Sequence, residues 1–124
     1  MCWCRHGGIF TVDVVELLRC RAVVGPANNQ LASNDVAAAF AARDVVWAPD
    51  FVVNAGGVIY GSLVDAQHVE PAAAMAKVEQ IGATLARVYA TAAEAGVTPY
   101  EAAARMARDR VAEADALRRA AVLA

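Results

Sequence analysis

The chain has 124 residues, a net charge of −2 and 59% apolar residues, many of them alanine. This length makes one small domain with a modest core, and alanine favours helix while burying little surface. The charge balance, with no block of basic residues, argues against nucleic acid or an anionic membrane as a partner. No apolar run is long enough to span a membrane, and the start "MCWCRHGG" lacks the apolar centre of a signal peptide. We therefore expect a cytoplasmic protein.

The few metal-ligating side chains do not form a recognisable metal site. Cys2 and Cys4 are closer together than the cysteines of a zinc knuckle, and no second ligand pair follows them. His6 and His68 are the only histidines in the chain. The sequence therefore predicts no metal, and its cysteines, including Cys20, are expected to stay reduced.

The first half of the chain alternates helix and strand signals. Short apolar runs end at Gly25-Pro26 and at Pro49, as strands do, and polar residues able to cap helices lie between them. Strand, helix and strand within thirty residues indicate a parallel βαβ unit. The predicted elements are a helix over 11–19 capped by Thr11, a strand over 22–24, a helix from about 33–35 to 42, and a strand over 44–48.

The second half of the chain carries only helix signals. Apolar residues repeat every three or four positions from residue 71 to about 94, and Gly96 is placed to end that helix in a left-handed cap. Thr98-Pro99-Tyr100-Glu101 has the pattern of a capping box and opens a last helix to about 116, beyond which the chain is expected to fray. We expect the arginines of this last helix to face water. The predicted apolar face of the first helix comprises Met75, Val78, Ile81, Leu85, Val88 and Ala92.

Asparagines follow both predicted strands. Asn28 and Asn29 come after the first strand and Asn54 follows the second, and ligands of parallel sheets bind at the carboxyl ends of strands. An amide side chain both donates and accepts hydrogen bonds, which suits a carboxamide or an amino acid. The same residues also commonly cap helices and fill turns, so both readings stay open. Gly56-Gly57, just beyond, either admits a close approach to the backbone or marks an awkward turn.

Three segments carry a resemblance to a known family. "VVGPANNQLA" followed by "VVWAPDFVVNAGGVI", with "GVTPYEAAARMARDRV" further on, resembles the C-terminal part of the glutamate, leucine, phenylalanine and valine dehydrogenases over roughly residues 7–114. The resemblance implies an α/β fold: the C-terminal part of a Rossmann-like NAD-binding domain, with short parallel strands and helices, followed by two long helices. Residues 1–55 would be a partial nucleotide-binding βαβ region, and 56–124 a helical region of the same truncated domain.

The resemblance also implies a reaction and its residues. Members of this family use NAD to oxidise an L-amino acid reversibly to a 2-oxo acid and ammonia, and the full-length enzymes are expected to be homo-oligomers. Asn28 would lie near the nicotinamide, and Asn54, at the start of the next helix, near both nicotinamide and substrate. Val58 and Gly61 would line the pocket for the substrate side chain, where glycine leaves more room than the usual apolar residue. Alternatively, Gly61 only marks a helix irregularity.

Other parts of the family pattern are missing. The lone lysine, Lys77, matches no catalytic position, no G-x-G-x-x-G loop is present, and "WCRHGG" keeps only Cys4 and the glycine pair of the family's segment. We therefore expect a truncated chain without catalytic residues, inactive alone, in which the strand over 22–24 has an exposed edge. The alternative is a non-catalytic remnant or helical interaction module. Upstream DNA encoding a lysine-bearing substrate domain would favour the enzyme.

Overall fold

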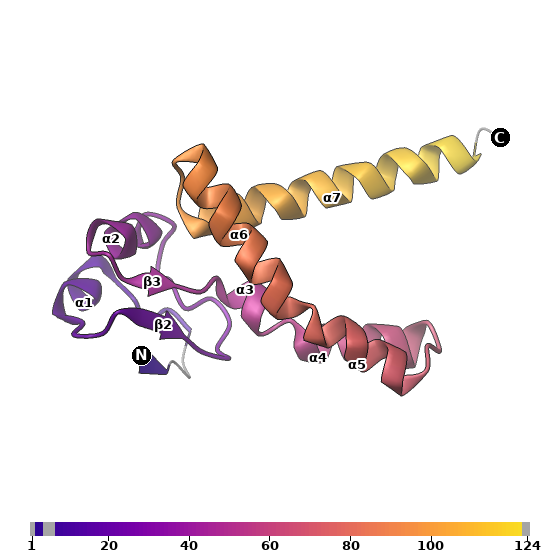
Figure 1. The fold of residues 1–124 in the computed structure, drawn as a ribbon, viewed down its shortest axis with the longest axis horizontal. Coiled ribbons are helices and arrows are strands. Elements are labelled where there is room, and N and C mark those ends of the chain that lie inside the picture. Colours follow the sequence, from indigo (N-terminus) through magenta and orange to yellow (C-terminus); the bar gives the residue numbers. More distant parts are fainter. Residues whose placement is uncertain (1, 4–6, 123–124) are drawn as a thin grey trace.

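A small parallel sheet with two helices lies at the N-terminal end of the molecule, and the remaining helices extend away from it (Figure 1). The structure is a computed structural model that describes residues 2–3 and 7–122. Its elements are β1 (Cys2–Trp3), α1 (Val12–Leu17), β2 (Ala22–Val24), α2 (Val36–Ala42), β3 (Val46–Trp47), α3 (Asp50–Val53), α4 (Gly56–Gly61), the π-helical turn η1 (Ser62–Ala66), α5 (Pro71–Glu79), α6 (Ile81–Ala95) and α7 (Pro99–Val122).

The sheet has the order β1-β2-β3, and both pairings are parallel. This confirms the predicted α/β class and the βαβ unit formed by β2, α2 and β3. The strand predicted over 22–24 is observed with those bounds, whereas the second strand is shorter than predicted. The expected exposed edge of β2 is wrong, because β1, which the sequence analysis did not predict, pairs with one side of it and β3 with the other.

Helix α1 is fixed at both ends by side-chain hydrogen bonds. The hydroxyl of Thr11 accepts from a backbone N–H of the first turn at 3.3 Å, as predicted. At the other end, the guanidinium of Arg43, which follows α2, donates to the carbonyls of Val15 (2.7 Å), Glu16 and Leu18 (3.2 Å). Arg43 thus adds hydrogen bonds to carbonyls at the end of α1, of which that of Val15 also accepts from the N–H of Leu18, and it ties the two helices together. The cap predicted for α2 over 33–35 is not made by a side chain.

A chain of aromatic contacts runs through the core of the sheet region. Phe40 lies edge-on to Phe10 with ring centroids 5.2 Å apart, and it stacks on Trp47 at 6.3 Å. Tyr100, at the start of α7, lies 6.4 Å from Trp47 and 6.0 Å from Phe51. Aromatic pairs at these separations add to the free energy of burial. The contacts therefore join the sheet, α3 and α7 into one body.

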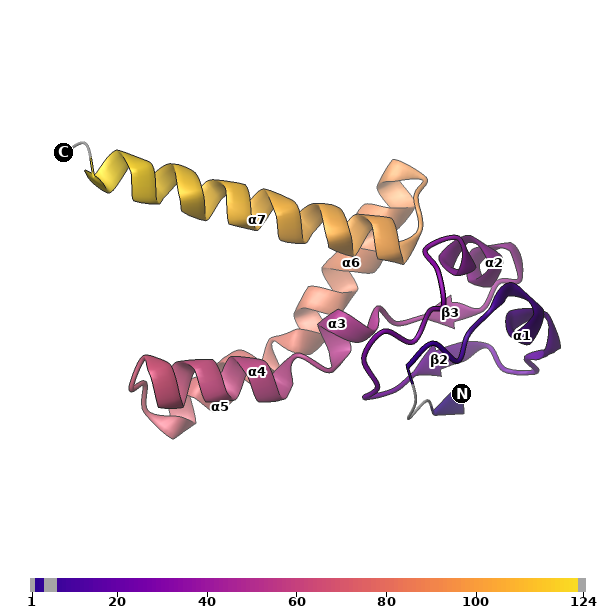
Figure 2. The same cartoon turned by 180° about the vertical axis from the view of Figure 1, so that it is seen from behind.

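The single long helix predicted from residue 71 is two helices, α5 and α6, that meet at Gln80. α5 lies beside α4, whereas α6 contacts α3 and α7 (Figure 2). The predicted apolar face is buried only where it meets α7, at Val88 and Ala92, whereas Met75 is 48% exposed. This second core consists of Val88, Ala92, Ala102 and Ala103.

The turn between α6 and α7 matches the sequence prediction closely. Gly96 adopts the left-handed conformation at φ 65°, and its N–H donates to the carbonyl of Ala92. The side chain of Thr98 accepts from the N–H of Glu101 at 3.2 Å, and the Glu101 carboxylate accepts from the N–H of Thr98 at 2.9 Å. This reciprocal pair is the predicted capping box. The helix that it opens runs to Val122, beyond the predicted end at about residue 116.

Beyond its first turns, α7 projects from the rest of the molecule (Figures 1 and 2). Arg105, Arg108 and Arg110 are exposed, as predicted, and so are the apolar side chains of Val111 (62%) and Leu117 (73%).

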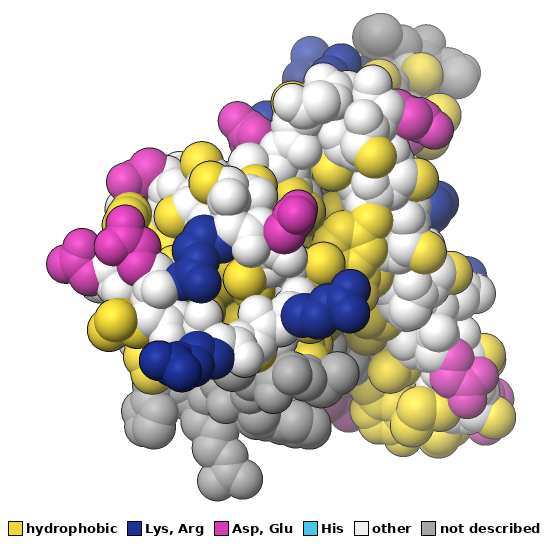
Figure 3. All heavy atoms as spheres, turned by 60° about the vertical axis from the view of Figure 1, so that its left-hand side comes forward, with side chains coloured by type: hydrophobic (Ala, Val, Ile, Leu, Met, Phe, Trp, Pro, Cys, Tyr) yellow, Lys and Arg dark blue, Asp and Glu magenta, His cyan; other side chains and the backbone are white. Residues whose placement is uncertain are grey.

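On the face seen in Figure 3, cationic and anionic side chains are interspersed. In the part of the chain that the structure describes, no helix has the length and apolar character needed to cross a membrane.

The capping box predicts a pH-dependent contribution to stability. Hydrogen bonds from Thr98 lower the pKa of Glu101 below its ordinary value. A group with a lowered pKa in the folded state stabilises fully above its ordinary pKa, and that stabilisation is lost as the pH falls through the lowered pKa. Urea unfolding should therefore find Glu101→Ala less stable than wild type at neutral pH, with the difference shrinking in acid. Glu113→Ala, an exposed site in the same helix, is the control, and an equal effect there would contradict the prediction.

Candidate functional site

The two asparagines predicted to act together are in contact. The side-chain nitrogen of Asn54 donates to the side-chain oxygen of Asn28, with the two atoms 2.5 Å apart, although the residues are 26 positions apart in sequence. The same nitrogen lies 3.4 Å from the carbonyl oxygens of Pro26 and Ala27. Asn54 therefore joins α3 to the loop that follows β2.

The position of this pair follows from the parallel strands. Asn28 lies in the loop after β2, and Asn54 ends α3, the short helix that directly follows β3 and Pro49. The carboxyl ends of neighbouring parallel strands lie at one edge of a sheet, which brings the two residues together. Asn54 was expected at the start of the next helix, but α4 begins two residues later, at Gly56.

In each asparagine, one side-chain polar group makes no hydrogen bond to another described residue. Asn54 uses its nitrogen and Asn28 its oxygen in the contact, so the Asn28 nitrogen and the Asn54 oxygen remain as one donor and one acceptor. Asn28 is exposed and Asn54 is half-buried. Beside them lies a hollow of about 200 Å³ lined by Val24, Gly25, Pro26 and Val53. The pair can thus bind a group that both donates and accepts, such as an amide or an amino acid backbone.

Beneath the asparagine pair lies a buried polar network that the sequence analysis missed. Asp50 is only 6% exposed, and its carboxylate accepts from the N–H of Gln30 at 2.7 Å and from that of Phe51 at 2.7 Å. A buried carboxylate is costly unless hydrogen bonds compensate it. The signal was present, because Asp50 is the one charge inside the apolar run that ends at Asn54. A charge in such a run must either leave the core or bind a partner within it.

Gln30 carries the rest of this network and is fully buried. Its side-chain nitrogen donates to the carbonyls of Gly25 at 2.9 Å and Ala27 at 3.0 Å, and its oxygen accepts from the indole N–H of Trp47 at 3.2 Å. Among the described residues, no buried side-chain polar atom lacks a hydrogen-bond partner. The loop over 25–30 is therefore held from inside by one amide side chain.

The same loop is held from outside by the glycine pair near the start of the chain. The N–H of Gly8 donates to the carbonyl of Asn29 at 2.6 Å, and Asn29 itself has a positive φ of 53°. A Cβ atom on Gly7 would lie 2.7 Å from the carbonyl oxygen of Asn28, closer than real Cβ contacts allow. Glycine is thus required at position 7 by the close approach of this loop.

Gly56 and Gly57, whose side-chain-free backbone suggested a close approach, differ in their surroundings. A Cβ atom on Gly56 would lie 3.3 Å from a methyl carbon of Val78 and 3.7 Å from one of Ile81, so this glycine lets α4 pack closely against its neighbours. A Cβ atom on Gly57 would meet nothing within 4 Å. Helix packing accounts for Gly56, and only Gly57 leaves backbone open to an incoming molecule.

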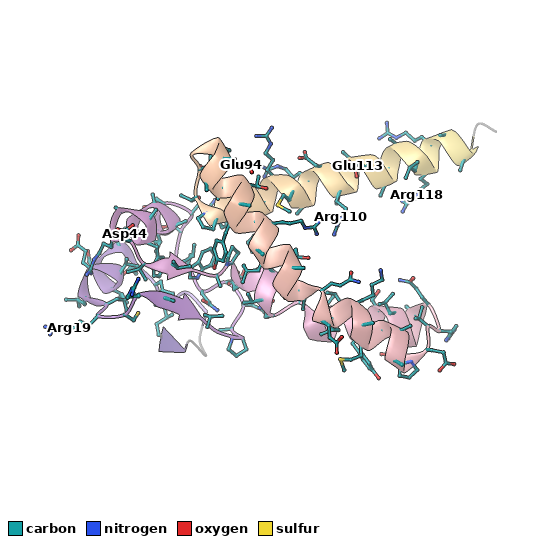
Figure 4. All side chains as sticks on the ribbon, in the orientation of Figure 1. Arg19, Asp44, Glu94, Arg110, Glu113 and Arg118 are labelled. Carbon is teal, nitrogen blue, oxygen red and sulfur yellow. The ribbon has the colours of Figure 1, made fainter. Side chains whose placement is uncertain are left out.

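The two residues predicted to line a side-chain pocket lie elsewhere. Val58 is 77% exposed and borders a largely apolar groove of about 840 Å³ between α4, α6 and α7. Its lining includes neither asparagine, and its charged members are Lys77, Arg87 and Arg110, the last labelled in Figure 4. A Cβ atom on Gly61, the last residue of α4, would meet only the Asp65 carboxylate, at 3.5 Å. Pocket roles for Val58 and Gly61 stay predictions.

No three histidine, cysteine or acidic side chains come together as a metal site within residues 2–3 and 7–122. Cys4 and His6, considered above as possible ligands, lie outside the described residues.

Comparison with known proteins identifies the family. Residues 5–119 match the family model for glutamate/leucine/phenylalanine/valine dehydrogenase. The chain belongs to this family. It is 42% identical to valine dehydrogenase of Streptomyces coelicolor over 112 residues, which are 90% of this chain and 30% of the relative. Leucine dehydrogenase of Thermoactinomyces intermedius is 37% identical over 87% of this chain and 29% of its own length. The chain thus spans about a third of the length of these relatives.

A solved structure agrees with this assignment. The crystal structure of L-tryptophan dehydrogenase from Nostoc punctiforme superimposes with a TM-score of 0.79 at 33% identity, covering 89% of this chain and 33% of that one. The resemblance read from "VVGPANNQLA" and "VVWAPDFVVNAGGVI" is therefore confirmed at the level of family and fold.

The open space at Gly57 leads to a stability prediction. Alanine favours a helix over glycine by about 0.5–1 kcal/mol, and a methyl group at Gly57 meets no neighbour. Gly57→Ala should therefore raise the free energy of unfolding by about that amount. Gly56→Ala should gain less, because its methyl group presses on Val78. Urea titrations of both variants measure the difference, and a larger gain for Gly56→Ala would show that the packing described here is incorrect.

Proposed function

We propose that this chain is the C-terminal part of an NAD-dependent L-amino acid dehydrogenase that interconverts leucine, valine or phenylalanine with the 2-oxo acid and ammonia. In the oxidative direction, the α-carbon loses a hydride to NAD, and the resulting imine is hydrolysed. One observation carries the proposal: in a member of this dehydrogenase family, Asn28 and Asn54 meet at the carboxyl ends of two parallel strands. This is the edge of a sheet where ligands bind.

The asparagine pair fits the cofactor's nicotinamide end in its chemistry. A carboxamide needs one donor and one acceptor from the protein, and the pair retains the Asn28 nitrogen and the Asn54 oxygen for this purpose. When bound, NAD supplies the hydride acceptor. The phosphate end has no matching loop in this sequence, so residues outside this chain would hold it.

This chain's own contribution would be binding and orientation. Asn28 and Asn54 would fix the nicotinamide and the reacting part of the substrate, and the open backbone at Gly57 would let both approach α4. Val58 and Gly61 would border the side chain of the amino acid. The lone lysine, Lys77, matches no catalytic position of the family, so the acid–base residues would come from the remaining two thirds of the enzyme.

A chimeric enzyme tests this proposal. Residues 5–119 would replace the matching segment of the Streptomyces coelicolor valine dehydrogenase, and NAD reduction would be followed with L-valine, L-leucine and L-phenylalanine. We expect the chimera to turn over and the 124-residue chain alone to show no activity. A folded chimera that neither reduces NAD nor binds NADH would exclude the dehydrogenase role and favour a non-catalytic module.

In the active chimera, Asn54→Ala should lower kcat/KM by roughly tenfold to a hundredfold. Without the Asn54 amide, the bound group that it would contact loses its hydrogen-bond partner, which costs about 1–3 kcal/mol. Asn29→Gly is the matched control, because glycine tolerates the positive φ of Asn29 and the change removes a neighbouring amide. A turn-filling role for Asn54 would instead lower the melting temperature and leave the kinetics per folded molecule unchanged.

Gly61 should control the size of the accepted side chain. Its Cβ position has room, so Gly61→Ala and Gly61→Val should fold. If the position borders the substrate, each added methyl group should reduce kcat/KM for phenylalanine relative to valine, by about tenfold or more for Gly61→Val. Gly57→Ala, tested in parallel, should weaken both substrates together. An unchanged phenylalanine-to-valine ratio in Gly61→Val would show that Gly61 lies away from the substrate.

A further inference from the structure

Asp50 and Gln30 are buried polar residues to which neither the family pattern above nor the proposed mechanism gives a role. Asp50 is 6% exposed and Gln30 is fully buried, and a core of this size gains little from polar side chains alone. Both residues lie directly behind the asparagine pair. Their hydrogen bonds connect the two segments that carry Asn28 and Asn54.

The first connection is between Asp50 and the loop. The carboxylate of Asp50 accepts from the N–H of Gln30 at 2.7 Å, and this contact joins the end of the loop over 25–30 to the first turn of α3. One turn later, the carbonyl of Asp50 accepts from the N–H of Asn54 at 2.9 Å. The distance between the loop and Asn54 is therefore fixed through Asp50.

The second connection is within the loop. The side chain of Gln30 donates to the carbonyls of Gly25 and Ala27, on either side of Pro26, and Trp47 of β3 holds its oxygen. The carbonyls of Pro26 and Ala27 then face the amide of Asn54 at 3.4 Å. The loop is thus joined to α3 at two points, by the Asp50 carboxylate at the start of the helix and by the Asn54 amide at its end.

We propose that Asp50 and Gln30 are positioning residues, which hold the Asn28 and Asn54 side chains at the distance where one donor and one acceptor remain for a ligand. The ligand itself rests on the function proposed above, but the positioning does not. A carboxylate is needed at position 50 because it accepts from two backbone N–H groups at once. An amide has one oxygen and must turn its N–H₂ group toward one of those donors.

Side-chain amide exchange in the 124-residue chain tests this proposal directly. The sequence has four asparagines and three glutamines, so the side-chain N–H₂ signals are few enough to assign by single substitutions. In wild type, the Asn54 amide should exchange slowly with solvent because it donates to Asn28. Asp50→Asn should accelerate this exchange by about tenfold, the factor for losing one hydrogen bond to a charged group, and Asp50→Ala by more.

A matched control separates positioning from general loss of stability. Arg43→Met removes the hydrogen bonds to the end of α1 and leaves the loop over 25–30 untouched. It should lower the free energy of unfolding of the chain. When wild type and Arg43→Met are compared at denaturant concentrations that leave equal fractions folded, the Asn54 amide should be as protected in the variant as in wild type. The proposal would be overturned if the Asn54 amide of Asp50→Asn exchanged within twofold of the wild-type rate. It would also be overturned if Arg43→Met accelerated this exchange as much as Asp50→Asn does.

A milder variant covers the case in which the Asp50 variants do not fold. Trp47→Phe removes the indole N–H that holds Gln30 and part of the ring volume, and it keeps an aromatic ring in the core. It should accelerate exchange of the Gln30 and Asn54 amides together, by about twofold or more for the loss of one neutral hydrogen bond. Acceleration at Gln30 without any at Asn54 would count against the coupling.

A titration with NADH distinguishes this proposal from the function on which its ligand rests. In the chimera, which contains the phosphate-binding residues of the relative, NADH should bind, and Asp50→Asn should raise its Kd. A folded chimera that does not bind NADH would reject the proposed cofactor contact, while the exchange measurements on the 124-residue chain would still decide whether Asp50 positions Asn54.

Discussion

The hydrogen bond from the backbone of Gln30 to the buried carboxylate of Asp50 is the contact on which the carboxyl edge of the sheet depends. It replaces water around a charge that the fold has removed from solvent, and without it this carboxylate would be costly to bury. The loop after β2 has no regular secondary structure, so its shape comes from contacts with other segments of the chain. Gln30 from the core and Gly7 and Gly8 from the chain start hold it in the one conformation that presents Asn28.

One strand of the sheet and the turn between α6 and α7 were predictable because their signals are local. The bounds of β2 follow from three apolar residues before Gly25-Pro26, and the Thr98–Glu101 box and the cap at Gly96 depend on neighbouring residues only. The contact between Asn28 and Asn54 was also within reach, because parallel strands bring their carboxyl ends together. The reaction was predicted from the family motifs, because hydrophobic periodicity carries no information about chemistry.

The features that the sequence did not yield depend on tertiary contacts. The break at Gln80 has one weak local signal, Gly82 two residues later, and α5 and α6 contact different neighbours on either side of it. β1 has two residues and too little pattern to predict. Gly56 and Gly57 look alike in sequence, and only the presence of Val78 beside one of them separates helix packing from open backbone. Asp50 and Gln30 were missed because polar residue types are usually found at the surface.

The projecting part of α7 has a consequence for how this protein unfolds. From Arg108 onward its side chains are almost all exposed, and Arg118 and Asp115 form a single surface ion pair at 3.9 Å. Such a segment is governed by its own helix–coil equilibrium, in which alanine, arginine and glutamate are favourable but no tertiary contact adds cooperativity. Its ellipticity would decline gradually on warming, while the fluorescence of the buried Trp47 would change only when the sheet region opens. The two signals would give different midpoints, and a single Tm would describe neither transition.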